Sequence, residues 1–132
     1  ANVVSMVIDD QDNIYIADHG NNRIRMYSSR SDIIVTIAGS GGVGFGGDGG
    51  LARFAMLRGP EGIALKPMVN VTGDGVGREV YFSDYLNQRI RKVVKTSAGW
   101  MIYTVAGTGT MGENPLCDTG CDALTEATLW NP

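Results

Sequence analysis

The sequence repeats one phrase. The stretch IYIADHGNNRIR at residues 14–25 returns as VYFSDYLNQRIR at residues 80–91, with six of the twelve positions identical. The identical pairs are Tyr15/Tyr81, Asp18/Asp84, Asn21/Asn87, Arg23/Arg89, Ile24/Ile90 and Arg25/Arg91. A repeat of this kind indicates that the fold is built from two copies of one supersecondary unit.

Two further blocks follow the phrase in the same order in both copies. VTIAGSG at 35–41 matches YTVAGTG at 103–109, and AMLRGP at 55–60 matches ATLWNP at 127–132. The shared order indicates a true internal duplication rather than a chance match between two short segments.

Each copy contains four short segments rich in β-branched and aromatic residues, separated by turn clusters such as DQD, HGNN and SSRSD. Such segments are typical of β-strands, and no segment has the length and 3.6-residue period of a helix. The expected strands are 5–9, 13–18, 23–27 and 33–39 in the first copy, and 62–65, 79–84, 89–93 and 101–107 in the second. The sequence therefore predicts an all-β chain with two four-stranded antiparallel sheets.

Four short antiparallel strands are the unit of a β-propeller blade. NIYIADHGNNRIR, TIAGSG and GFGGDGGLARFAMLRGPEGIAL closely resemble NHL repeats, a family of propeller repeats, over nearly the whole chain. The second copy departs from the pattern at MGENPLCDTGCDALTEATLWNP. The resemblance implies a partial propeller over residues 1–132, with blade one at about 1–59, blade two at about 60–132 and an insert at 66–78.

Two blades fall short of the four to eight that close a propeller. We therefore expect the chain to be a piece of a longer propeller, or to complete a ring with other copies as a homo-oligomer. In either case its apolar faces pack against other blades. Tyr15 and Tyr81 are expected to fill equivalent sites between blades. Arg23 and Arg89 are expected to bind the repeated aspartates or loop carbonyls.

The connectivity of a blade assigns the loops to two ends of the molecule. The loops DHGNN and DYLNQ share one end with the glycine-rich linkers between blades, whereas the insert projects from the other end. Functional side chains on rigid scaffolds gather on such loops. The ligand-face candidates at the end that holds the linkers are Asp18, His19, Asp48, Asp84 and Tyr85, with Glu113, Asp118 and Asp122 beside them.

These candidates leave the chemistry open. Carboxylates around a channel could hold calcium, but Asp48 in GGDGG is better explained as shaping its own turn. His19, the only histidine, could act as a base or metal ligand, or could simply face solvent at a turn. We assign no catalytic residue from the sequence.

Composition narrows the partners. No apolar run approaches the roughly 18 residues of a membrane span. A net charge of −3 and arginines that recur at repeat positions argue against RNA binding.

Two weak signals point to the secretory pathway or the extracellular space. Asn70 begins an N-glycosylation triplet, NVT, and Cys117 and Cys121 in CDTGC could form a disulfide or remain free thiols. A structural metal at these two thiols is disfavoured, because they supply too few ligands.

We therefore expect a binding scaffold that presents loops to a protein or small ligand, rather than an enzyme. The alternative is part of a propeller enzyme, a metal-assisted lyase or hydrolase, that further blades complete.

Overall fold

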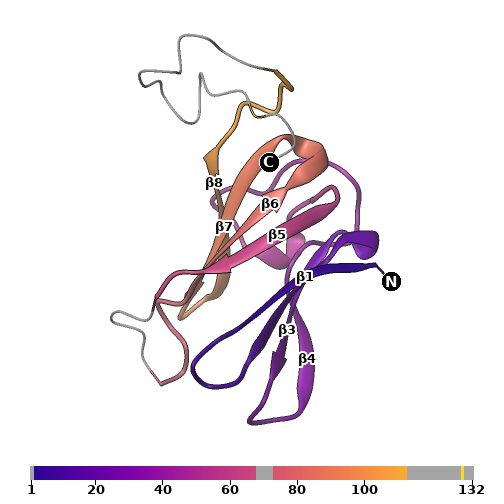
Figure 1. The fold of residues 1–132 in the computed structure, drawn as a ribbon. Coiled ribbons are helices and arrows are strands. Elements are labelled where there is room, and N and C mark those ends of the chain that lie inside the picture. The colour runs from indigo at the N-terminus through magenta and orange to yellow at the C-terminus, as the bar shows by residue number, and fades with distance from the viewer. Residues whose placement is uncertain (1, 68–72, 113–128, 130–132) are drawn as a thin grey trace.

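The computed structural model describes residues 2–67, 73–112 and 129, and this part of the chain is all-β (Figure 1). Its strands form two four-stranded antiparallel sheets, each with its strands in chain order. Sheet 1 contains β1 (Val3–Ile8), β2 (Ile14–Asp18), β3 (Arg23–Ser28) and β4 (Ile33–Ala38). Sheet 2 contains β5 (Pro60–Leu65), β6 (Glu79–Asp84), β7 (Arg89–Thr96) and β8 (Gly99–Ala106). The prediction of two four-stranded antiparallel sheets is confirmed.

The described residues contain no α-helix, and their helical segments are three single 3₁₀ turns. Two of these turns occupy equivalent places, since η1 (His19–Asn21) joins β2 to β3 and η3 (Tyr85–Asn87) joins β6 to β7. The third, η2 (Ala52–Phe54), lies in the segment that connects the two sheets.

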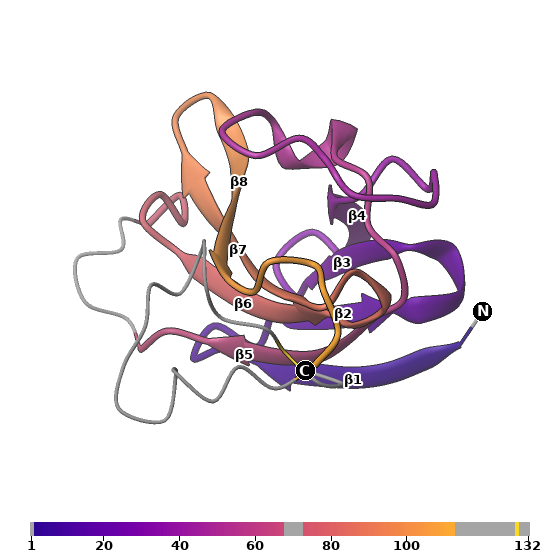
Figure 2. The same ribbon diagram turned by 90° about the horizontal axis from the view of Figure 1, so that it is seen from above.

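The two sheets diverge like the sides of a wedge (Figure 2). β1 and β5 lie side by side, whereas β4 and β8 approach each other at only a few places. The linker, residues 39–59, fills the gap between these outer strands. Arg23 Nη2 of β3 donates to the Ser40 carbonyl at 3.1 Å, and the Gly49 N–H donates to the Ile102 carbonyl of β8 at 2.8 Å. The linker is therefore bonded to both sheets.

The hydrophobic core lies between the facing sides of the sheets and continues under the linker. Its buried residues come from β2, β3 and β4, from the linker, and from all four strands of sheet 2. They are Tyr15, Ala17, Ile24, Ile37, Ala38, Ala52, Ala55, Leu57, Ile63, Val80, Phe82, Val93 and Ile102.

The repeated turn chemistry has a backbone cause. Asn22 and Gln88, which follow η1 and η3, both adopt the left-handed conformation at φ 52°. Gly39 and Gly107, at φ 93° and 98°, lie so close to the carbonyls of Asn22 and Gln88 that a Cβ would overlap the oxygen. The repeated Ala-Gly step after β4 and β8 is thus required by close backbone approach.

The two sheets meet through different faces. Sheet 1 contributes the face with Tyr15, Ala17 and Ile24, whereas sheet 2 contributes the face with Val80, Phe82 and Val93. Phe82 is the repeat counterpart of Ile16, which points to the opposite side of sheet 1 from Tyr15. Tyr15 is therefore only 2% exposed between the sheets, whereas Tyr81 lies half-buried on the outer face of sheet 2.

Polar groups at the start of the second strand differ between the repeats. In sheet 2, Glu79 accepts hydrogen bonds from Lys66 Nζ at 2.8 Å and from Tyr81 Oη at 2.7 Å. Lys92 Nζ lies 3.6 Å from the same carboxylate. The hydrogen bond from Lys66, then that from Tyr81, lower the pKa of Glu79 from 4.5 to about 2. The ionised form of Glu79 is therefore stabilised by folding.

This shift predicts a pH dependence of stability. A carboxylate with a lowered folded-state pKa stabilises the fold above its unfolded pKa, and that contribution is lost as the pH falls through the folded value. The free energy of unfolding should therefore fall between about pH 4.5 and pH 2 more steeply in the parent chain than in Glu79→Gln. At pH 7 the substitution should cost about 1 kcal/mol. Urea denaturation at a series of pH values measures both effects.

A matched variant separates the carboxylate from its donors. Lys66→Met keeps the carboxylate but removes its strongest donor, so part of the pH dependence should remain. Identical pH dependence in Glu79→Gln and the parent chain would contradict the assignment.

Candidate functional site

The structure places the predicted ligand-face residues at one end of the molecule, here named the linker end. η1 and η3 lie there beside the linker. The linker's Gly59 N–H donates to Oδ1 of Asn22, the residue after η1, at 2.9 Å, and the Leu86 N–H of η3 donates to the Arg58 carbonyl of the linker at 3.1 Å. The end of the insert lies elsewhere, beside β7, where the Gly77 N–H donates to the Lys95 carbonyl at 2.8 Å. Among the described residues, the two loops and the 39–59 linker therefore lie together, and the end of the insert lies apart from them.

Two of the predicted residues meet around one buried arginine. The fully buried Arg91 guanidinium contacts Asp84 Oδ2 at 3.0 Å and Asp48 Oδ1 at 2.8 Å, and it donates to the Gly46 carbonyl at 3.1 Å. Burial raises the pKa of Asp84, while hydrogen bonds from Asn87, the Arg58 N–H and Arg91 oppose the shift. These contacts favour a structural role for Asp84. Asp48 also accepts a hydrogen bond from the Thr104 hydroxyl at 2.6 Å.

The other predicted residues of the linker end do not share this cluster, although Asp18 is also buried. Asp18 accepts hydrogen bonds from Asn21 Nδ2 at 2.9 and 3.0 Å, and Arg25 lies 3.8 Å away. His19 Nδ1 lies 3.5 Å from Glu61 Oε1 of sheet 2. Tyr85 is half-buried in η3. A role for these residues in ligand binding stays a prediction.

Arg23 and Arg89 bind loop carbonyls rather than the repeated aspartates. Arg23 donates to the carbonyls of Asn21 and Ser40, at 3.3 and 3.1 Å. Arg89 donates to those of Asn87 and Thr108, at 3.0 and 2.7 Å. The third residue of each RIR motif, Arg25 or Arg91, is the one that faces the aspartate.

Several sequence predictions fall outside residues 2–67, 73–112 and 129. These are the acidic residues Glu113, Asp118 and Asp122, the glycosylation candidate Asn70, and the cysteines Cys117 and Cys121. Within the described ranges, no three His, Cys, Asp or Glu side chains gather as a metal site would require. Calcium binding stays an untested prediction.

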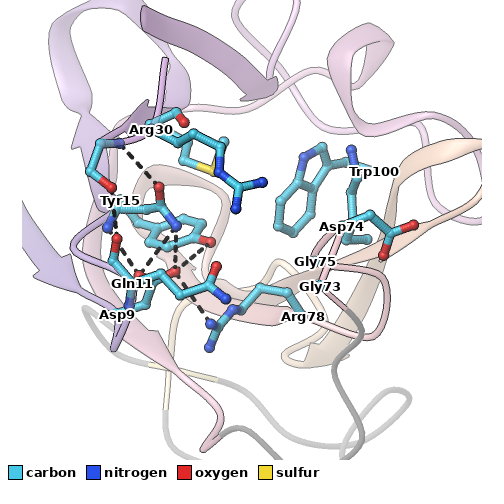
Figure 3. Close-up of a pocket in the computed structure, with 14 residues that line it drawn as sticks. Asp9, Gln11, Tyr15, Arg30, Gly73, Asp74, Gly75, Arg78 and Trp100 are labelled. Carbon is cyan, nitrogen blue, oxygen red and sulfur yellow. Dashed lines mark hydrogen bonds and ion pairs between the residues drawn. The ribbon is translucent and has the colours of Figure 1, made fainter. Parts of the chain in front are cut away.

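A pocket of about 440 Å³ lies at the opposite end, between the two sheets (Figure 3). Its walls come from the β1–β2 turn, the β3–β4 turn, the last residues of the insert, and the facing ends of β7 and β8. The Ser29 hydroxyl donates to the Gln11 carbonyl at 2.7 Å, and the Ser29 N–H donates to Asn13 Oδ1 at 3.2 Å. These bonds hold the two turns of sheet 1 together. We name this cavity the inter-sheet pocket.

Asp9 lies in the wall of the pocket as a fully bonded carboxylate. It accepts hydrogen bonds from the N–H groups of Gln11 and Asn13, each at 2.9 Å, and from Tyr15 Oη and Arg78 Nη2, each at 3.2 Å. Burial raises the pKa of Asp9, but the hydrogen bonds from Asn13 and Gln11 and the charge of Arg78 outweigh it, so the pKa lies below 3.8. Asp9 is therefore a structural anion and a poor base at neutral pH.

Two aromatic rings form the apolar part of the pocket. Tyr15 and Trp100 meet edge to face, with ring centroids 6.3 Å apart and planes inclined by 77°. Burial, and then the charge of Asp9, raise the pKa of Tyr15 to about 12. Tyr15 therefore stays protonated at neutral pH. With Asp9 ionised, this pair is suited to holding a shape rather than to transferring protons.

The remaining charged groups of the pocket are mainly cationic. Arg78 is occupied by Asp9 and by Asp10, whose Oδ1 lies 3.3 Å from Nη2. Lys95 Nζ lies 5.8 Å from the centre of the Trp100 ring. Arg30 extends from the β3–β4 turn toward the cavity (Figure 3). Sequence reasoning missed this site, because its residues come from turns and an insert that the two repeats do not share.

The comparisons with known proteins support the fold alone. No family model and no curated protein matches the sequence. The structure is similar to that of a protein from Bacteroides thetaiotaomicron described as a "Putative phosphatase", with a TM-score of 0.63 and 21% sequence identity. The match covers 96% of this chain but only 28% of the other, so the chain spans little more than a quarter of that protein. The resemblance to NHL repeats stays a prediction.

None of the helices in the described part of the chain is long and apolar enough to cross a membrane.

The two repeated aspartates predict unequal costs of substitution. Asp84→Asn removes a buried partner of the buried Arg91 guanidinium, so it should lower the free energy of unfolding by about 3 kcal/mol. Asp18→Asn at the matched position weakens a longer contact to the partly exposed Arg25, so it should cost about 1 kcal/mol or less. Urea denaturation followed by circular dichroism measures both costs. Equal costs would contradict the structural role of Asp84.

Proposed function

We propose that the chain is a two-blade segment of an NHL-type β-propeller and acts as a binding scaffold. The observation that carries the proposal is the contact of the two sheets through non-equivalent faces. A contact of this kind is heterologous, and repeated heterologous contacts generate rings when the rotation closes. The wedge between the sheets supplies such a rotation (Figure 2).

The outer face of sheet 1 supports the proposal, because it is apolar and its counterpart in sheet 2 is covered. Met6 is 63% exposed, whereas Ile63 at the same repeat position is 9% exposed. Ile34 is 50% exposed, whereas Ile102 is fully buried. We name this surface open face A. Its apolar members are Met6, Ile8, Ile14, Ile16, Tyr27 and Ile34.

The outer face of sheet 2 is the counterpart of the buried face of sheet 1. Tyr81 and Ile90 are half-buried there, whereas Tyr15 and Ile24 at the same repeat positions are buried. We name this surface open face B, formed by Ala64, Tyr81, Ser83, Ile90, Lys92 and Tyr103. Because face A resembles what sheet 2 buries and face B resembles what sheet 1 buries, the two are expected to fit each other.

The surroundings of Arg91 and Arg25 also support a further sheet on face A. Arg91 is enclosed by Asp84 together with Asp48 and the Gly46 carbonyl of the preceding linker. Its counterpart Arg25 has Asp18 at 3.8 Å but remains partly exposed on face A. A preceding blade would bring a linker to Arg25 as the described linker is brought to Arg91.

A binding role is supported by the inter-sheet pocket. The Asp9 carboxylate accepts hydrogen bonds from the Tyr15 phenol and from Arg78, so neither Asp9 nor Tyr15 is a free base or nucleophile. The alternative of a propeller enzyme finds no cluster of metal ligands in the described residues. The word phosphatase describes the structurally similar protein and gives no support to a phosphatase activity of this chain. Protein partners, an extracellular location, glycosylation at Asn70 and a Cys117–Cys121 disulfide remain parts of the proposal.

Two complementary variants test the head-to-tail arrangement. Met6→Lys/Ile8→Lys places charges on face A, and Ala64→Lys/Tyr81→Lys places charges on face B. Each variant keeps one intact face, so each alone should be a monomer of about 14.1 kDa. A 1:1 mixture should form a heterodimer of about twice that mass, because the intact face B of one fits the intact face A of the other. Light scattering measures the masses.

Val43→Lys, at an exposed linker position off both faces, is the control and should associate like the parent chain. Circular dichroism checks that every variant keeps its strands. If one face variant dimerises alone and the mixture forms no heterodimer, the contact is isologous. Either that result or a monodisperse monomeric parent chain at high concentration would overturn the head-to-tail proposal.

A further inference from the structure

We propose that the inter-sheet pocket binds a small organic anion that carries a flat ring, an inference that rests on the binding role proposed above. The pocket lies outside the ligand face that the sequence predicts. Its volume of about 440 Å³ is within the range of small-molecule sites. The cavity is formed within one chain, since both sheets and the insert contribute to its wall.

The charges of the wall favour an anion. Three basic residues, Arg30, Arg78 and Lys95, face two acidic ones, Asp9 and Asp74, in a chain whose net charge is −3. Arg78 is neutralised by Asp9 and Asp10, and Asp74 accepts a hydrogen bond from the Val76 N–H. The basic excess therefore falls on Arg30 and Lys95.

These two cations lack acidic partners in the described part of the chain. Among the described residues, neither Arg30 nor Lys95 takes part in an ion pair. The ammonium group of Lys95 lies 5.8 Å from the centre of the Trp100 ring. A guanidinium is planar and presents a fork of N–H donors, which matches the two oxygens of a carboxylate or phosphate. Arg30 is therefore suited to bind the anionic group.

The aromatic wall favours a flat ring on the same ligand. Trp100 lies across the cavity from Arg30 (Figure 3), and its ring meets that of Tyr15 edge to face. Tyr15 is buried and held by Asp9, so Trp100 supplies the half-exposed ring surface. A ligand ring that packs on Trp100 gains apolar burial, while its anionic group reaches Arg30 and Lys95.

Four probes separate the charge from the ring. Benzoate carries both, benzamide carries the ring without the charge, and acetate carries the charge without the ring. Phenyl phosphate replaces the carboxylate by a phosphate. Isothermal titration calorimetry should detect benzoate or phenyl phosphate, and should show about tenfold weaker binding of benzamide and acetate. Whichever of the two ring-bearing anions binds more tightly identifies the anionic group.

Variants then assign the residues. Arg30→Gln should weaken binding of the ring-bearing anions about tenfold, and Lys95→Gln should weaken it in the same direction. Arg53→Gln is the matched control, because Arg53 is exposed in η2 away from the pocket, and it should leave affinity unchanged. Trp100→Leu should weaken the ring-bearing probes but not acetate, and Trp100→Phe should recover part of the loss.

Three results would each overturn the inference. They are benzamide binding as tightly as benzoate, unchanged affinity in both Arg30→Gln and Lys95→Gln, or no binding of either ring-bearing anion up to about 10 mM. Because the pocket lies within one chain, these titrations do not depend on contacts between copies. A failed titration with an intact heterodimer of the face variants removes the ligand class alone. A lost heterodimer with intact ligand binding removes the head-to-tail proposal alone.

Discussion

A four-stranded antiparallel sheet with apolar side chains on both faces is unstable alone in water, and the rest of this structure depends on that constraint. Burying one face against a second sheet removes Tyr15, Ile24, Phe82 and Val93 from solvent, and each such side chain contributes roughly 1.5–3 kcal/mol when fully buried. The twist of each sheet makes the pair diverge from β1 and β5 outward (Figure 2). The linker must then occupy the gap, which accounts for its hydrogen bonds to β8 and to Arg23 of β3.

The buried cluster around Arg91 fixes how the linker occupies that gap. A buried ion pair is weak evidence for stability, because desolvation offsets much of the attraction. Here the guanidinium bonds at once to β6 through Asp84 and to the linker through Asp48 and Gly46. An uncompensated charge would be left if the linker shifted, so the cluster selects one path for the chain. Arg25, with no preceding linker among the described residues, keeps only the weaker half of this arrangement.

The sequence predicted the strands well because many of the repeated residues meet local requirements of the backbone at the turns between strands. Asn22, Gln88, Gly39 and Gly107 serve turns that local chemistry determines. The inter-sheet pocket escaped prediction for the opposite reason. Arg30, Arg78 and Trp100 come from separate turns and strands, and only the angle between the sheets brings them together. Likewise, burial of Asp84 and exposure of Arg25 depend on which face is covered, and identical residues in a repeat cannot reveal that.

The repeated residues therefore determine the strands and turns, and the residues that differ between the repeats determine the polar contacts. In the first repeat Asn13, immediately before the second strand, donates to Asp9, immediately after the first strand. In the second repeat the acceptor Glu79 stands at the place of Asn13, and the donor Lys66 stands at the place of Asp9. The donor and the acceptor have therefore exchanged positions. In the first repeat the carboxylate of Asp9 recruits Arg78 from the following sheet, and the inter-sheet pocket forms above that contact. In the second, Lys66 satisfies Glu79 within its own sheet. A further sheet packed on face B would thus meet a gap that needs no arginine.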